Sequence, residues 1–172
     1  LAYINTLPNN FAWDDRDFLL NWPQIKGSEE LPAYLSLPYL LAGDVPTNHR
    51  GVYRPIRSVL YLVSYNFFGE NPFPYHIQSI IIHTLIVIVI YFLTMQITQK
   101  RTLAFIVSIL FATHPIHTES VSYITASFDN LGILFFFLSF SFYIRERIFA
   151  SVIYGFLAFL TYEITLVLPL LI

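Results

Sequence analysis

The sequence contains no cysteine and little charge. The absence of cysteine excludes disulfides, thiolate catalysis and cysteine-ligated metals, so any outward-facing segment must be held by packing and by a bilayer. Only 12% of the 172 residues are Asp, Glu, Lys or Arg, and the formal net charge is -2. No basic cluster lies near the start of the chain. We therefore expect no nucleic-acid partner.

Apolar residues are abundant by contrast. They make up 56% of the chain, and the mean hydropathy is +0.61, which exceeds the usual range of soluble domains. The chain starts at Leu1, stops at Ile172 inside an apolar run, and has no signal-peptide pattern, so we expect a fragment truncated at both ends. We predict an all-α, polytopic helical membrane protein in contact with the lipid bilayer.

The second part of the chain, residues 76–172, is predicted to form a transmembrane bundle. The run from Ile77 to Gln99 lacks Asp, Glu, Lys and Arg, and at about 1.5 Å per residue it can cross a hydrocarbon core of roughly 30 Å. Between Leu134 and Phe142 there is no polar stripe of the kind a soluble helix shows. The predicted helices cover residues 76–99, 102–121, 127–144 and 148–162, and residues 164–172 begin another.

Residues 1–75 differ in composition, since they are rich in Pro, Asn and Tyr and carry most of the charge. We predict a large, ordered outer loop that precedes the first complete span. Arg57 to Phe68 separates apolar from polar residues at helical spacing, as an interfacial helix does. This loop would face the periplasm or the lumen.

Charge of opposite sign occupies alternate connections between the apolar stretches. The basic connections hold Lys100, Arg101, Arg145 and Arg147, and the acidic ones hold Glu119, Asp129 and Glu163. Basic residues in short loops mark the cytoplasmic side. We therefore expect a multi-pass protein of a prokaryotic plasma membrane or of the endoplasmic reticulum, with its polar chemistry on the outer or lumenal face.

The first candidate for chemistry is the acidic pair Asp14 and Asp15. Adjacent carboxylates repel each other, which favours a shared proton or a bound cation. Such a pair suits a general base or a divalent-metal site, and the metal requirement stays open. The alternative is structural, because Asp at a helix N-terminus caps free amides and complements the dipole.

Two further motifs hold candidate groups. His114, His117 and Glu119 on a helix end could hold a proton relay, a phosphate or a metal, or they could form a polar turn at the membrane surface. Arg54, between Tyr53 and Pro55, could clamp a phosphate or pair with Asp14 or Asp15.

Polar residues inside the spans form another group. His76, Ser79 and His83 fall on one side of the first span. They could line a cavity or hydrogen-bond to neighbouring helices. Asp129 and Glu119 in the outer half of the membrane would be costly, and a functional site is the default explanation of such groups.

Four segments together resemble a known family. They are FAWDD (residues 11–15), YRPI (residues 53–56), Tyr75 with His76 and His83, and HPIHTESV (residues 114–121). The pattern resembles the GT-C class of polyprenyl-phosphate-sugar-dependent glycosyltransferases. Within that class it is most similar to the protein O-mannosyltransferase-like group that includes the transmembrane and tetratricopeptide-repeat proteins. The family tends to carry cations where this chain has Ser127 and Tyr162.

The resemblance implies a GT-C-like membrane hexosyltransferase for protein glycosylation. It would move a sugar, with mannose as one candidate, from a polyprenyl-phosphate-linked donor to a hydroxyl of a protein or glycan acceptor. Asp14 and Asp15 become catalytic candidates, with Asp14 as the general base. For the donor phosphate or the substrate we predict binding by Arg54, His114, His117, Glu119, His76, His83, Asp129 and Glu163. It also implies a tetratricopeptide-repeat part elsewhere in the protein.

Two other functions fit parts of the sequence. A polytopic transporter or flippase would use intramembrane His76, His83, Glu119 and Asp129 as its path. A non-catalytic membrane scaffold would need none of these groups for chemistry.

Overall fold

A computed structural model describes residues 2–21 and 54–170, and all regular structure in these two ranges is helical. The all-α prediction is confirmed for this part of the chain. Residues 1 and 22–53 of the predicted outer loop, Tyr53 among them, lie outside the described residues, as do the last two residues of the predicted final helix. The elements are η1 Ile4–Thr6, η2 Arg16–Leu20, α3 Pro55–Phe68, α4 Pro72–Thr98, α5 Arg101–Thr113, η5 Pro115–His117, α6 Thr118–Ser122, α7 Ile124–Ile144, α8 Ile148–Thr161 and η6 Glu163–Leu170.

Two helices in the described ranges are long and apolar enough to cross a membrane, α4 and α7. The start of α4 follows from its sequence, because the Asn71 side chain accepts a hydrogen bond from the Phe73 N–H at 3.2 Å and Pro72 has a helical φ and needs no amide partner. The helix ends at Gln99, which has a left-handed conformation with φ 56°. At about 1.5 Å per residue, the length of its 27 residues exceeds the thickness of a hydrocarbon core of roughly 30 Å.

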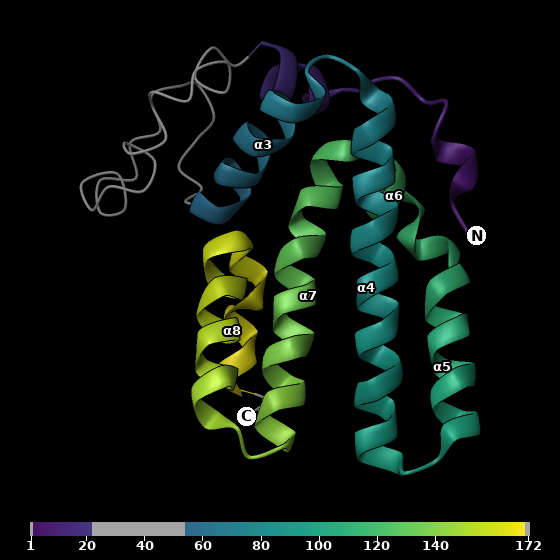
Figure 1. The fold of residues 1–172 in the computed structure, drawn as a ribbon, viewed down its shortest axis with the longest axis vertical. Coiled ribbons are helices and arrows are strands. Elements are labelled where there is room, and N and C mark those ends of the chain that lie inside the picture. The colour runs from purple at the N-terminus through teal and green to yellow at the C-terminus, as the bar shows by residue number, and fades with distance from the viewer. Residues whose placement is uncertain (1, 22–53, 171–172) are drawn as a thin grey trace.

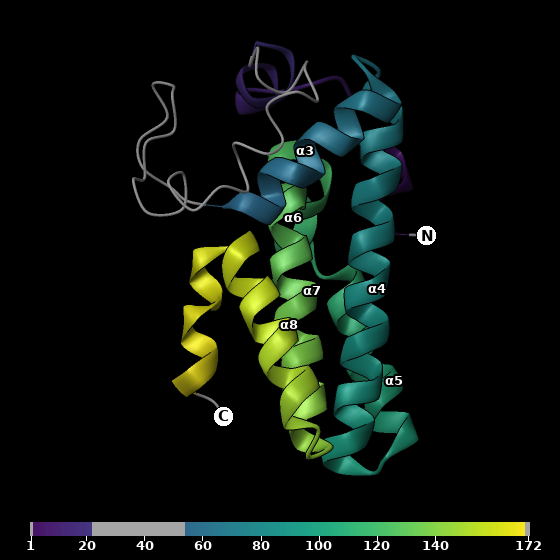
Figure 2. The ribbon, with the colours of Figure 1, turned by 60° about the vertical axis from the view of Figure 1, so that its left-hand side comes forward.

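The helices form a bundle with two distinct ends. In Figures 1 and 2, α4 and α7 lie side by side, α5 flanks α4, and α8 flanks α7. The two basic connections, between α4 and α5 and between α7 and α8, lie at the same end. Helix α3 and the segment from η5 to α6 lie at the opposite end. The two basic connections therefore lie at the end of the bundle remote from α3 and the segment from η5 to α6.

The outer faces of the flanking helices are apolar. On α5, Phe105 and Leu110 are 58% and 61% exposed, and on α8 Phe149 and Phe156 are 81% and 60% exposed. Apolar surface this extensive is not typical of a soluble monomer. It matches the lipid-facing surface of a membrane protein.

The connection between α5 and α7 differs from the prediction. A single helix was expected over residues 102–121, but α5 ends at Thr113 and His114 is extended, with ψ 128°. The reason is Pro115, whose ring disfavours the helical conformation of the residue before it. The short helices η5 and α6 follow, and α7 then begins at Ile124, three residues before the predicted start at 127.

Helix α3 packs with its polar side inward. Arg57, Tyr61 and Ser64 are buried, whereas Val63 and Phe67 are 40% and 80% exposed. Val63 and Phe67 lie on the predicted apolar face, whereas Leu62, predicted on the same face, is buried at 5% exposure. An apolar outer face at the end of the bundle is the arrangement of a helix that lies in the membrane interface.

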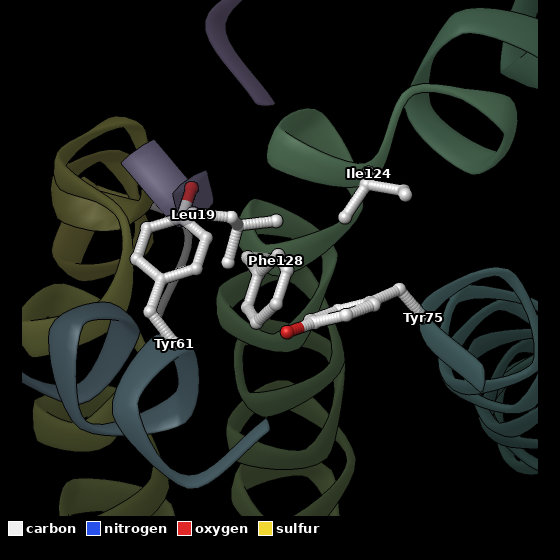
Figure 3. Close-up of a cluster of buried hydrophobic side chains, with 5 residues drawn as sticks. All are labelled: Leu19, Tyr61, Tyr75, Ile124 and Phe128. Atoms are coloured by element: carbon white, nitrogen blue, oxygen red, sulfur yellow. The ribbon is translucent and has the colours of Figure 1, made fainter. Parts of the chain in front are cut away.

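An aromatic core joins the N-terminal segment to the bundle. Leu19, Tyr61, Tyr75, Ile124 and Phe128 are all at most 2% exposed. Figure 3 shows Phe128 of α7 between Tyr61 of α3 and Tyr75 of α4, and the Tyr61 and Phe128 rings are 4.2 Å apart. This cluster holds the segment with the acidic pair against the start of α7.

Candidate functional site

The candidate residues gather at the end of the bundle opposite the basic connections. They form three groups: the acidic pair at the start of α7, a charge network between α3, α7 and η6, and a histidine cluster where α4 meets the end of α5. The first group comes from a segment that turns sharply at Trp13, which has φ 43°. After this turn the acidic pair begins.

Asp15 is buried, with 1% of its surface exposed, and its carboxylate is hydrogen-bonded on both oxygens. Oδ1 accepts from the Thr125 N–H at 2.7 Å and from the Thr125 hydroxyl at 2.6 Å. Oδ2 accepts from the Ala12 N–H at 3.0 Å. Thr125 lies in the first turn of α7, where amides have no partner within the helix. Asp15 therefore caps α7 from another part of the chain.

Asp14 has a different environment, because it is exposed. Its backbone N–H donates to the Tyr123 hydroxyl at 3.2 Å. Burial, followed by the nearby charges of Asp14 and Asp15, raises the pKa of Tyr123 to about 12. That hydroxyl therefore stays protonated at neutral pH, and Asp14 has a hydrogen-bonding neighbour that sequence reasoning missed.

A depression of about 420 Å³ adjoins the acidic segment. Its lining residues are Asn10, Phe11, Arg16, Leu20 and Asn21. In the described ranges no group of three or more His, Asp or Glu side chains is placed to hold a metal ion. Both oxygens of Asp15 already accept hydrogen bonds, so the pair does not present two free carboxylates to a cation.

The second group is a network of two guanidinium and two carboxylate groups. Arg54 Nε and Nη2 donate to Glu163 at 2.6 and 2.5 Å, and Nη1 donates to the Asp129 oxygens at 3.0 and 3.1 Å. Of the partners considered from sequence for Arg54, the structure shows neither Asp14 nor Asp15. The reason is position, since Arg54 is the N-cap of α3 and this helix contacts α7 and α8.

Arg57 and Tyr61 complete this network, and sequence reasoning did not place them in the site. Arg57 Nη1 lies 3.0 Å from Asp129 Oδ1, and its Nε and Nη2 donate to the Tyr61 hydroxyl at 2.9 and 2.7 Å. Their i, i+4 spacing on the polar face of α3 was the available signal. Among the described residues the network holds two positive and two negative groups, and pairing of this kind offsets the cost of burying charge.

The network opens toward solvent at Glu163. The Glu163 side chain is 43% exposed, against 17% for Arg54 and 19% for Asp129. Hydrogen bonds from Arg54 lower the pKa of Glu163 despite its partial burial. The Arg54 guanidinium also lies over the Tyr162 ring, 4.8 Å from its centroid. Tyr162, at a position where the resemblance expects a cation, thus positions a cation from another helix.

The third group consists of histidines with aromatic neighbours. The His83 and His117 rings are 5.5 Å apart, and Phe111 lies 5.8 and 4.2 Å from them. His114 lies 6.2 Å from His117, and its Nδ1 accepts from the Ile116 N–H. Burial, and then the neighbouring His83 and His114, lower the pKa of His117. His117 is therefore neutral at pH 7.

The polar face of α4 is used for packing. His76 Nε2 lies 3.2 Å from the Asn9 carbonyl, His83 Nε2 lies 3.3 Å from the Ala112 carbonyl, and the Ser79 hydroxyl donates to the Val121 carbonyl. Of the two roles left open for this face, the structure shows hydrogen bonding between neighbouring segments. His76 Nδ1 is buried without a hydrogen-bond partner among the described residues.

The structure therefore unites some predicted residues and separates others. Arg54, Asp129 and Glu163 meet in one network, and three of the histidines form one cluster. Glu119 is exposed on α6, and no hydrogen bond or ion pair joins its side chain to the other described candidates.

Comparison with known proteins gives relatives with one shared name. The chain is 32% identical over 148 residues to the human protein O-mannosyl-transferase TMTC1. This alignment covers 85% of this chain and 17% of the human protein. It is 29% identical over 150 residues to a protein O-mannosyl-transferase of Caenorhabditis elegans, with 86% and 22% covered. It is 30% identical over 152 residues to the Xenopus laevis protein O-mannosyl-transferase tmtc2, and this alignment covers 85% of this chain and 18% of the Xenopus protein.

The other comparisons found nothing. No protein-family model matches the chain, and no solved structure matches it. The chain spans about a fifth of the length of the curated relatives that it matches. Over most of its own length, this chain is thus a homologue of a short part of proteins named protein O-mannosyl-transferases.

Proposed function

We propose that this chain is the catalytic membrane part of a GT-C-like glycosyltransferase. It transfers mannose from a polyprenyl-phosphate donor to a hydroxyl group of a protein on the outer or lumenal face. The observation that carries the proposal is that Asp14 contacts the N-cap of α7, the Arg54 network begins at the N-cap of α3, and the histidine cluster includes η5. These elements lie at the end of the bundle remote from the basic connections. The names of the relatives support the sugar and the protein acceptor.

The exposed Asp14 supplies the base of this reaction. Its carboxylate takes the proton of the acceptor hydroxyl as the hydroxyl oxygen attacks the anomeric carbon. The bond from that carbon to the phosphate oxygen breaks, and the lipid phosphate leaves as an anion. We assign the acceptor to the depression lined by Asn10, Phe11 and Arg16, on the same segment of the chain as Asp14.

The departing phosphate needs positive or hydrogen-bonding groups. Arg54 is the described cation with a guanidinium fork that matches phosphate oxygens, and it is reached from the open side at Glu163. A phosphate that approaches from this side takes the Arg54 donors now used by Glu163. His114 and His117 add hydrogen bonds at the same end of the bundle.

The hydrogen bonds of α4 favour an enzyme over a transporter. A transport path through α4 would need His76 and His83 to exchange partners with a solute. Both rings instead contact backbone carbonyls of neighbouring segments and are at most 6% exposed.

The direct test replaces Asp14 by Asn in the full-length protein, reconstituted in liposomes with polyprenyl-phosphate mannose and threonine-containing peptides. We expect transfer to fall about 100-fold or more, as for loss of a general base. Asp17→Asn is the matched control, since Asp17 is an exposed acid on the same segment, and it should transfer at the wild-type rate. Unchanged transfer by the Asp14 variant in a folded protein would refute the proposal.

A further inference from the structure

We infer that the two acids of the pair divide their work: Asp15 is a positioning residue that holds the start of α7, and Asp14 alone meets the substrate. This inference rests on the proposed function for the role of Asp14. Its structural half, the capping of α7 by Asp15, stands on geometry alone. The two neighbours differ in exposure, in partners and in the elements that they contact.

The carboxylate of Asp15 is placed as a helix cap. Tyr123 is the N-cap residue of α7, and its side chain makes no capping hydrogen bond within the helix. The Thr125 amide, in the first turn, instead donates to Asp15 Oδ1 at 2.7 Å. A carboxylate at this position also complements the positive end of the α7 dipole. The capping group of α7 is therefore supplied by a residue 110 positions earlier.

Asp15 has little capacity left for substrate. An ionised carboxylate offers about four acceptor sites, and three hydrogen bonds from Ala12 and Thr125 occupy most of them. Its exposure is only 1%. A general base must reach the proton that it removes within about 3 Å, directly or through one water. Asp14 is exposed and meets this requirement, whereas Asp15 does not.

The capped turn leads to the charge network. Asp129 follows Thr125 by four residues, which places it one turn further along the same side of α7. The Thr125 carbonyl accepts from the Tyr61 hydroxyl at 3.5 Å, and Tyr61 in turn accepts from Arg57, which contacts Asp129. Asp15 thus fixes the first turn of α7. The next turn carries Asp129, which contacts Arg54.

The test compares Asp15→Asn, Asp15→Ala and Asp14→Asn in the full-length protein. Asn keeps an oxygen that can accept from both Thr125 donors, whereas Ala removes the cap. Amide hydrogen exchange over residues 124–126 reads the cap without any substrate. We expect exchange about tenfold faster in Asp15→Ala, and close to wild-type in Asp15→Asn and Asp14→Asn.

Mannose transfer, measured as a function of pH, tests the second half of the inference, that Asp14 alone meets the substrate. Asp15→Asn should keep transfer within about tenfold of wild-type and keep the shape of the pH–rate profile, because the base is still present. Asp15→Ala should lose more of its transfer rate than Asp15→Asn. Thr125→Val, which lacks the hydroxyl donor, should have a transfer rate between those of the two Asp15 variants. Wild-type exchange in Asp15→Ala would overturn the cap. Transfer by Asp15→Asn as low as by Asp14→Asn, with normal exchange, would overturn the division of work and leave the proposed function intact.

Discussion

At the scale of single residues, the end of the bundle remote from the basic connections depends on the shape of one side chain. Arg54 engages two carboxylates from different elements through three of its nitrogens, and its planar face lies on Tyr162. An ammonium group has the same charge but neither the fork nor the plane. Geometry, more than charge, makes this position irreplaceable.

We therefore expect Arg54→Lys to lose both stability and transfer. Lys can satisfy only part of the hydrogen bonding of Asp129 and Glu163, so the free energy of unfolding should fall by about 2 kcal/mol. Thermal unfolding in detergent measures this loss, and Arg16→Lys, at an exposed arginine, is the control. A wild-type midpoint for Arg54→Lys would show that the fork is not required.

The ion pair at Glu163 predicts a pH dependence of stability. Hydrogen bonds from Arg54 lower the pKa of Glu163 from an ordinary value near 4.5. The unfolded chain therefore takes up the proton first, so this stabilisation is complete above pH 4.5 and is lost as the pH falls through the lowered pKa. The difference in midpoint between wild-type and Glu163→Gln should shrink on acidification from about pH 6 to about pH 3. A constant difference would contradict this assignment, and Glu146→Gln, at the other end, is the control.

Sequence reasoning found some of these residues but not their contacts. Arg54, Asp129 and Glu163 were candidates because charge is rare in an apolar chain. The pairing of Arg54 with residues 75 and 109 positions away depends on how three helices meet, which no local pattern encodes. Arg57 was hidden for a related reason, because an amphipathic helix in isolation does not show that its polar side faces the protein.

At the scale of elements, the approach of α7 to the end of α8 requires a glycine. A Cβ atom on Gly132 would lie 2.8 Å from Tyr162 Cβ and 3.3 Å from the Tyr162 backbone nitrogen. Neither atom can move without moving the junction between α8 and η6. That junction also carries Glu163, so the contact couples packing to the charge network.

Gly132→Ala should therefore destabilise the protein, by about 1 to 3 kcal/mol as for other overpacked sites. Gly155→Ala is the matched control on the same helix pair. Its added Cβ would meet the ends of the Leu168 and Ser139 side chains at 3.1 and 3.2 Å, and a side chain can shift where backbone cannot. Thermal midpoints in detergent should rank wild-type, Gly155→Ala and Gly132→Ala in falling order. Equal midpoints for the two variants would contradict the close contact.

Element boundaries followed from sequence where local chemistry decides them. Pro72 begins α4, and Pro115 causes the break at His114. The predicted start of α4, residue 76, was therefore four residues late. The predicted helix over residues 102–121 did not include the break between α5 and α6, although Pro115 was the local signal for it. The N-terminus of α7 was placed late because its cap comes from Asp15, far away in the sequence.

At the scale of the whole molecule, the bundle keeps its basic connections at one end and its candidate chemistry at the other. Composition alone predicted helices, since 56% apolar residues with long uncharged runs leave few other folds. It did not predict how segments far apart would meet. The described apolar surface and the two long helices favour a membrane protein.

The proposed orientation can be tested with single cysteines, because this chain contains none of its own. Ile116→Cys lies at the end with the histidines and is 72% exposed, and Thr102→Cys lies near the basic connection. We expect a membrane-impermeant maleimide to label Ile116→Cys from the outer or lumenal side and Thr102→Cys from the cytosolic side. Labelling of both from one side would contradict the topology.

The contacts that close the outer end also bear on how the protein is made. Three of them join residues 109 to 111 positions apart: Tyr3 to the His114 carbonyl, Asp15 to Thr125, and Arg54 to Glu163. The hairpin of α4 and α5 forms from neighbouring segments and can assemble as soon as it leaves the ribosome. Until η6 has been synthesised, Arg54 lacks its partner Glu163. This end of the described bundle would thus mature after the hairpin.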